Sequence, residues 1–316
     1  MAKQHPTRPY IRKLGTIECN NIVETTPLIW KGELYRFEVV RSKSFTATNA
    51  CSDWNELGDS PCLRFVHVRS NTPTPLFADD HTFGFPYVVG DTMYVVTGAG
   101  KDWGVDTLDF FKSKDLVSWE KHTQVHLPGW KIYNMNIAEK NGVYTLLIEI
   151  RAPKEEAGKP FTFRFMQSTD MTNWTLTPSE CVFQKDRYAG SPSLYAYEDD
   201  PYYYVGYLEA YPRGFANCIA RSKDLINWEY SPINPVLMYN DFEDKQIASA
   251  FLTPEDRQRI DEALDINNSD MELCEYLGRT LIYYSWGDQQ GTEFLAEAWY
   301  EGPMHEFLKS WFEPKA

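Results

Sequence analysis

Two glutamates lie inside runs that are otherwise apolar and aromatic. Glu149 is embedded in LLIEIR and Glu209 in GYLEAY. Each lies five residues after a tyrosine of the same run, Tyr144 and Tyr204. Burial raises the pKa of a carboxylic acid, because the charged form loses its hydration, and a general acid must be protonated at neutral pH. Arg151 and Arg213 are close in sequence, so a structural ion pair is the alternative for each glutamate.

Two further carboxylates lie at the same distance before an apolar run. Glu24 lies three residues before Pro27, and Asp270 lies three residues before Leu273. Asp270 ends the polar segment NNSD, for which a turn stabilised by Asn and Ser side chains is the alternative. The matching positions predict that Glu24 and Asp270 occupy equivalent places in two repeated units.

The composition limits the possible partners. The chain of 316 residues is 43% hydrophobic, which is enough for one large core or two small ones. It has 45 acidic and 31 basic residues, and the net charge of −14 repels phosphate backbones and anionic lipids. No apolar stretch approaches the roughly 20 residues of a membrane span, and the first residues lack a secretory signal. We therefore expect a cytoplasmic protein that binds neither nucleic acid nor membranes.

Six cysteines are spread along the chain without a CxxC pair or a Cys/His cluster at zinc spacing. This spacing predicts reduced thiols that mostly serve as packing residues. They are Cys19, Cys51, Cys62, Cys181, Cys218 and Cys274.

A repeated motif indicates the elements that position these side chains. The pattern S-x-D-L/M-x-x-W occurs at 113–119, 168–174 and 222–228, and its copies start 55 and 54 residues apart. Ser and Asp side chains bond to nearby backbone amides in turns, Leu or Met can fill a core, and Trp can begin the next strand. Each copy therefore predicts the end of one structural unit.

Five hairpin-like segments accompany the motif, each an apolar run, a turn and an aromatic-rich run. They lie at 27–37, 86–96, 137–148, 194–207 and 273–284. Units of about 50 to 60 residues with about four short strands each predict an all-β, five-bladed β-propeller. The predicted blades span 20–75, 76–125, 126–180, 181–235 and 265–312.

One segment between the fourth and fifth units predicts a helix. Thr253 is a typical N-cap, Pro254 suits the first helical position, and two acids follow. We expect a short helical insertion at about 253–264. Because no Pro/Gly/Ser-rich linker divides the chain, residues 1–316 are predicted to form one domain.

In its blade motif the chain resembles the five-bladed propeller glycoside hydrolases, which include families 43, 32, 62, 117 and 130. The resemblance covers residues 20 to 312. It implies that carboxylates at the starts of the innermost strands meet at one rim, although they are far apart in sequence. Glycoside cleavage requires two such carboxyl groups, about 5 to 5.5 Å apart for retention and about 6.5 to 9.5 Å for inversion.

The resemblance makes Glu24, Asp270, Glu209 and Glu149 the candidate catalytic residues. The chain also departs from the family pattern. Relatives commonly carry an Asp directly before Pro27, where this chain has Thr26, and many family 43 relatives carry a Glu where this chain has Gly190 and Ser191. Either Glu24 replaces the missing acid of the first blade, or another blade supplies it.

Several polar and aromatic residues are expected to bind substrate at the same rim. Histidine and acids can bind hydroxyls, a guanidinium can bind an anionic group, and an indole can stack on a sugar. The alternatives are a solvated turn for the acids and histidine and core packing for the tryptophans. The candidates are Asp80, His81, Trp103, Asn134, Arg187, Trp286, Asp288 and Gln289.

We therefore expect a glycoside hydrolase, with an exo action on a short oligosaccharide or glycoside and without a cofactor. A metal site and the oligomeric state are left open. A glycoside phosphorylase is one alternative, for which Arg187 and Arg213 are the available cations. A non-catalytic carbohydrate-binding propeller and a protein-interaction propeller are the others.

Overall fold

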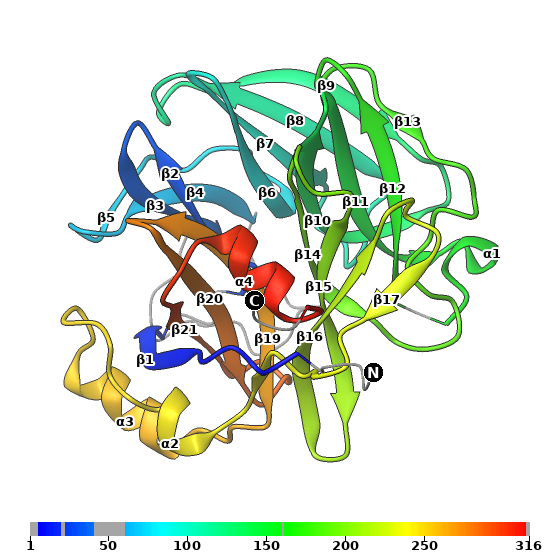
Figure 1. Cartoon of the computed structure of the whole chain (residues 1–316). Helices are drawn as coiled ribbons and strands as arrows, with labels where there is room; N and C mark the ends of the chain where they lie inside the picture. Colours follow the sequence, from blue (N-terminus) through cyan, green and yellow to red (C-terminus); the bar gives the residue numbers. More distant parts are fainter. Residues whose placement is uncertain (1–5, 20–22, 41–60, 160, 314–316) are drawn as a thin grey trace, which may run out of the picture.

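The computed structural model describes residues 6–19, 23–40, 61–159 and 161–313 of the chain (Figure 1). Its described part is dominated by 21 strands in four sheets. The alternating apolar and aromatic runs noted above form these strands, and most of the short turns between them contain glycine or asparagine.

Three of the sheets are four-stranded antiparallel meanders, in which each strand pairs with the next along the chain. The first contains β2 (Thr26–Trp30), β3 (Glu33–Val40), β4 (Cys62–His67) and β5 (Thr72–Pro73); the second β6 (His81–Val89), β7 (Thr92–Ala99), β8 (Thr107–Ser113) and β9 (Glu120–His126); and the third β10 (Lys131–Lys140), β11 (Val143–Ala152), β12 (Thr162–Ser168) and β13 (Thr175–Leu176).

The fourth sheet has nine strands and two parts, which are joined by a single parallel pair between Phe215 and Asn267. The first part contains β14 (Gly190–Ala196), β15 (Tyr203–Tyr211), β16 (Gly214–Ser222), β17 (Trp228–Tyr230) and β18 (Leu237–Met238); the second β19 (Asn267–Tyr276), β20 (Arg279–Gly287), β21 (Glu293–Tyr300) and β1 (Arg12–Glu18). The first strand of the chain therefore pairs with the last one.

Four short helices complete the described chain: α1 (Lys154–Ala157), α2 (Asp241–Asp244), α3 (Pro254–Glu262) and α4 (Met304–Ser310). Helix α3 lies between β18 and β19, where the sequence predicted a helix. The Thr253 hydroxyl accepts a hydrogen bond from the Asp256 amide, and the Asp256 carboxylate accepts one from the Thr253 amide. This capping box and Pro254 explain why the helix begins there.

The repeated motif forms the same turn three times. In the first copy, the Ser113 hydroxyl accepts a hydrogen bond from the Leu116 amide at 2.9 Å, and Asp115 accepts bonds from the next two amides at 2.9 and 2.8 Å. The residue after each Asp is buried with a left-handed backbone, at Leu116, Met171 and Leu225. The motif therefore works as a strand-ending turn with a core plug, as the sequence predicted.

The strands that open the units contact each other in ring order, which brings their starts together. Strand β2 contacts β6, β6 contacts β10, β10 contacts β14, β14 contacts β19, and β19 contacts β2. Four of the five contain a register shift near the start, and the backbone is left-handed at Phe83, Ser191 and Asp270, and at Glu24 just before β2. Such bulges redirect side chains, and here they lie at the rim of the ring.

The junction between β1 and α2 holds a buried carboxyl pair. The Lys13 ammonium donates to Asp244 at 2.7 Å, and both groups are nearly inaccessible. Asp265 lies beside Asp244, yet neither of its buried carboxylate oxygens has a hydrogen-bond donor. A proton on Asp265 would let it donate to Asp244, so this geometry favours the protonated form.

Asp265→Asn is expected to stabilise the protein at pH 8. Burial, and then the charge of Asp244, raises the pKa of Asp265 from its ordinary 3.8 to about 8. The fold prefers the protonated acid, so its stability falls as the pH rises from the ordinary pKa towards 8. Asparagine carries no charge and can donate to Asp244, which should raise the unfolding free energy at pH 8 by about 1–3 kcal/mol.

Urea unfolding at pH 5 and pH 8 would measure the effect of the Asp265 variant. The gain should be larger at pH 8, whereas Asp261→Asn on the exposed side of α3 should change little at either pH. A variant that is less stable than the wild type at pH 8 would show that Asp265 is held as a carboxylate.

Candidate active site

A cavity of about 200 Å³ lies at the rim where the opening strands converge. Four carboxyl groups line it, from Glu24, Glu149, Asp270 and Glu293, together with Asn134, and five aromatic rings also line it. A space of only about 10 Å³, lined in part by Glu24, Asn134 and Asp270, adjoins it and is large enough for about one water molecule. No lysine or arginine belongs to the described lining of either space.

Glu149 on β11 is the clearest acid of this cavity. Its side chain is buried, and Asn134 Nδ2 donates to Oε2 at 2.8 Å. Burial raises the pKa of Glu149 to about 8, and the charge of Asp270 adds to the rise. Arg151, which the sequence offered as an ion-pair partner, instead lies beside the Tyr133 hydroxyl. Burial thus favours the protonated form of Glu149, which is the form that could donate a proton to a ligand.

Asp270 and Glu24 line the same cavity from two other sheets. Both have a left-handed backbone, with φ of 51° and 52°, and both also line the small adjoining space. Their equivalent positions before β2 and within β19 agree with the spacing noted in the sequence. The structure thus brings Glu24, Asp270 and Glu149 together from segments more than 100 residues apart.

Glu272 is a further buried carboxyl group, which the sequence reasoning missed. It accepts hydrogen bonds from Asn136 Nδ2 at 3.0 Å and from the Tyr195 hydroxyl at 3.2 Å. Burial, and then the charge of Asp270, raises the pKa of Glu272 well above its ordinary value. It lines the small space beside Asp270. The sequence signal was its position two residues after Asp270 on the same strand.

Glu209 does not line the cavity. Its carboxylate pairs with the Arg187 guanidinium at 2.8 Å and accepts a hydrogen bond from Tyr207 at 3.4 Å. Arg187 also donates to Gln184 at 2.9 Å and lies over the Tyr230 ring. Glu209 and Arg187 therefore form a structural ion pair. The partner is Arg187 and not Arg213, which is nearer in sequence.

The second-sheet candidates also lie outside the lining. His81 Nε2 faces Asp109 Oδ2 at 3.0 Å, its Nδ1 faces the Asp79 carbonyl at 2.8 Å, and Asp80 pairs with Lys101 at 3.2 Å. Three hydrogen bonds, from His81, Lys121 and Gln124, hold the pKa of Asp109 at about 2 despite its burial. These contacts form a polar network around the buried Asp109, and none of them is directed at the cavity.

Two candidates on β20 and the following loop have structural contacts. Trp286 is fully buried, stacks on Phe294 and donates a hydrogen bond to the Thr16 hydroxyl at 2.9 Å. It is therefore a core residue, and a sugar cannot reach its ring. Asp288 closes the loop by accepting from the Gln290 and Thr292 amides. Three binding candidates do line the cavity: Trp103, Asn134 and Gln289.

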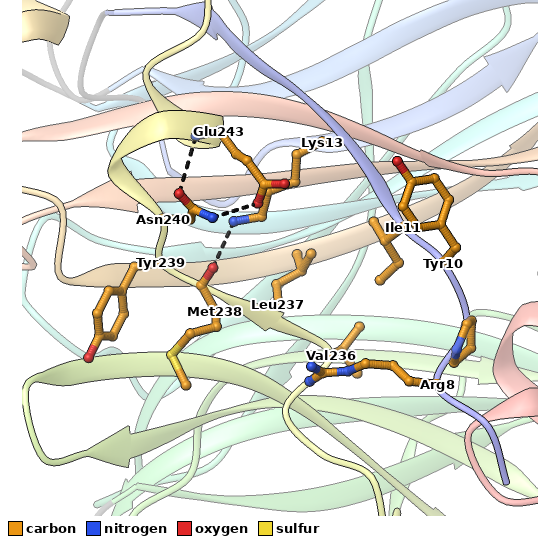
Figure 2. A pocket seen from close by; sticks show the side chains of 11 residues that line it. Arg8, Tyr10, Ile11, Lys13, Val236, Leu237, Met238, Tyr239, Asn240 and Glu243 are labelled. Carbon is orange, nitrogen blue, oxygen red and sulfur yellow. Dashed lines mark hydrogen bonds between the residues drawn. The ribbon is translucent and has the colours of Figure 1, made fainter.

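A second hollow, of about 310 Å³, lies between the N-terminal segment and the residues around β18 (Figure 2). Lys13 is the buried cation there, and it donates to the Met238 carbonyl, Asp244 and Asn268, each at 2.7 Å. All three N–H groups of its ammonium are therefore used within the protein. The convergent acid groups lie in the other cavity.

Other features of the described chain are simple. None of its helices is long and apolar enough to cross a membrane. No group of three or more His, Cys, Asp or Glu side chains among the residues described could hold a metal ion. The described cysteines are all buried, as expected of packing residues, and Cys51 lies outside the described residues.

The fold is similar to that of known glycoside hydrolases. An α-L-arabinofuranosidase from Podospora anserina, solved in complex with cellotriose, superposes with a TM-score of 0.62 and 8% identity, over 95% of this chain and 99% of that chain. BT0996, solved as an RGII complex, superposes with a TM-score of 0.59 and 13% identity, over 95% of this chain and 93% of that chain. A Bombyx mori family 32 β-fructofuranosidase superposes with a TM-score of 0.57 and 12% identity, over 90% of this chain and 61% of that chain.

No protein-family model matches the chain, and no curated protein sequence matches it. At identities this low, the likeness to the solved structures shows the fold alone. That fold is the propeller type of glycoside hydrolases, which the blade motif had predicted.

Proposed function

We propose that the protein is a glycoside hydrolase built on a single five-bladed β-propeller. The three four-stranded sheets would be three blades, and the two parts of the nine-stranded sheet would be the other two, with β1 completing the last blade. The ring order of β2, β6, β10, β14 and β19 supports this count. Helix α3 then lies in an insertion before the last blade. Residues 20–22 and 41–60 of the first blade lie outside the described residues.

The observation that carries the proposed reaction is that Asp270 and the buried Glu149 line one cavity. Glu149 would donate its proton to the departing glycosidic oxygen. Asp270, helped by Glu24, would act as the base that activates water or as the nucleophile. The small adjoining space beside Asp270 offers room for about one water molecule.

The size of the cavity supports an exo action. Pockets for drug-sized ligands span roughly 300 to 1,000 Å³, and this cavity of about 200 Å³ is smaller. It accommodates one terminal sugar and a small leaving group better than an internal stretch of a polymer. The substrate class is thus a short oligosaccharide or a simple glycoside.

The activity of the wild type is expected to fall as the pH rises through about 8. Glu149 must be protonated to act as the general acid, and its pKa is raised to about 8. In Asn134→Ala the alkaline fall should move to higher pH, because the hydrogen bond that it removes favours the ionised form of Glu149. Values of kcat/KM measured from pH 5 to pH 10 would show both effects. A wild-type kcat/KM that stays constant to pH 10 would exclude Glu149 as the general acid.

An NMR screen of the purified protein tests the reaction itself. Aryl glycosides and short oligosaccharides are incubated with and without phosphate while the anomeric protons are followed. A hydrolysed sugar is the expected product, and its anomeric form shows retention or inversion. A sugar phosphate would support a phosphorylase instead, although no cation lines the described cavity.

A non-catalytic carbohydrate-binding protein is the second candidate. Thr26, Gly190 and Ser191 stand where relatives carry acids, and this observation favours it. Saturable binding of a sugar without any product in long incubations would support this function.

A further inference from the structure

Five aromatic side chains form one continuous wall of the cavity. Each ring contacts the next, with centroids 4.8 to 6.0 Å apart along the series Phe83, Trp103, Tyr133, Phe161 and Tyr188. Most of these contacts are edge-on or tilted, which is the favourable geometry for aromatic pairs. The wall is therefore a cooperative unit rather than a set of separate residues.

The wall is held rigidly from behind. Phe83 and Tyr133 are almost fully buried, whereas Trp103, Phe161 and Tyr188 are partly accessible. Behind Trp103, a Cβ on Gly104 would lie 2.7 Å from the Tyr133 ring, and the backbone there is left-handed with φ of 85°. Glycine lets the loop approach this closely, so the accessible rings rest on a preformed support.

The wall meets the proposed acid at one end. A Cβ placed on Gly190 would lie 2.6 Å from the Tyr188 hydroxyl and 3.3 Å from Glu149 Oε1, so glycine lets the acid and the wall approach each other. Burial and the charge of Glu149 both raise the pKa of Tyr188, which keeps its hydroxyl neutral. A general acid donates to the leaving oxygen, so a leaving group protonated by Glu149 would begin beside the Tyr188 end of the wall.

The chemistry of the wall selects the leaving group. Of the three accessible rings, Phe161 offers no hydrogen-bonding group, and Trp103 and Tyr188 offer one polar group each. A sugar placed there would bury hydroxyls with few partners, which is costly, whereas a flat apolar ring would pack well. Resting on the proposed hydrolysis, we propose that the wall is the leaving-group subsite and that the natural substrate is a glycoside with an aromatic aglycone.

Matched substrates test this proposal. Methyl, cyclohexylmethyl and benzyl glycosides of one sugar all release simple alkyl alcohols, and a disaccharide of the same sugar supplies a polar leaving group. The benzyl glycoside should have the lowest KM, about tenfold below that of the methyl glycoside, because its ring is buried on the wall. Trp103→Ala should bring the ratio of the methyl KM to the benzyl KM close to one.

Tyr10→Ala is the matched control, because Tyr10 is an exposed aromatic residue away from the cavity. It should keep the benzyl preference. Equal KM values for the three alkyl glycosides, a cyclohexylmethyl value as low as the benzyl value, or a lower KM for the disaccharide would each overturn the aromatic aglycone while leaving the hydrolase intact. Turnover of none of the four would overturn the proposed function itself, and this inference with it.

Discussion

Glu149→Gln is expected to lower kcat by about 10²- to 10⁴-fold on alkyl glycosides, which is the usual contribution of a general acid. Glutamine keeps the size of the side chain and can still accept the hydrogen bond from Asn134 Nδ2. The loss therefore reports the missing proton rather than a lost contact. Steady-state kinetics on methyl and benzyl glycosides would measure it.

A leaving group that needs no protonation separates this role from a structural one. On a dinitrophenyl glycoside the Glu149 variant should keep most of its activity, because the phenolate leaves without a proton. Glu209→Gln is the matched control, since that glutamate pairs with Arg187 outside the cavity. An equal loss on both substrates, or an equal loss in the Glu209 variant, would contradict the assignment.

Asp270→Asn is the second variant with a large expected effect, a fall in kcat of about 10²-fold or more. Asparagine tolerates the left-handed backbone at this position, so the strand should fold as before. The variant removes the negative charge that would activate water or attack the sugar. In a second variant, Asp270→Gly, the place of the carboxylate is empty and the left-handed backbone is tolerated, so a small anion such as azide should restore part of the turnover of a dinitrophenyl glycoside.

Glu24→Gln provides the comparison for Asp270, because both carboxylates line the same spaces. The expected result is a larger loss in Asp270→Asn than in Glu24→Gln, with rescue by azide in Asp270→Gly alone. Asp261→Asn on α3 controls for the change of net charge. Wild-type turnover in Asp270→Asn would remove this residue from the reaction.

The repeats and the acids before apolar runs were visible in the sequence. The spacing of the motif predicted the strand-ending turns, and the equal distances to Pro27 and Leu273 placed Glu24 and Asp270 at equivalent positions. Glu149 was predicted because a carboxyl group in an apolar strand is costly unless it has a role. These signals depend only on neighbouring residues, and the corresponding turns and positions are found in the structure.

The remaining site residues depend on contacts that local patterns do not contain. Glu209 gave the same signal as Glu149, but Arg187, which pairs with it, lies 22 residues away and on another segment. Trp286 was a candidate for stacking on a sugar, although its strand turns it into the core against Phe294. Glu272 lies in an apolar run after Asp270, and only its hydrogen bonds with Asn136 and Tyr195, which lie on two other strands, show that it belongs to this site.

The central claim is that Glu149 and Asp270 cleave a glycosidic bond in one cavity. The most direct test follows the anomeric protons by NMR for the wild type, Glu149→Gln and Asp270→Asn with the same panel of aryl and benzyl glycosides. We predict a new anomeric signal with the wild type and a strongly slowed one with both variants. A signal that is equally fast in all three proteins, or sugar binding by the wild type without any product, would contradict the claim.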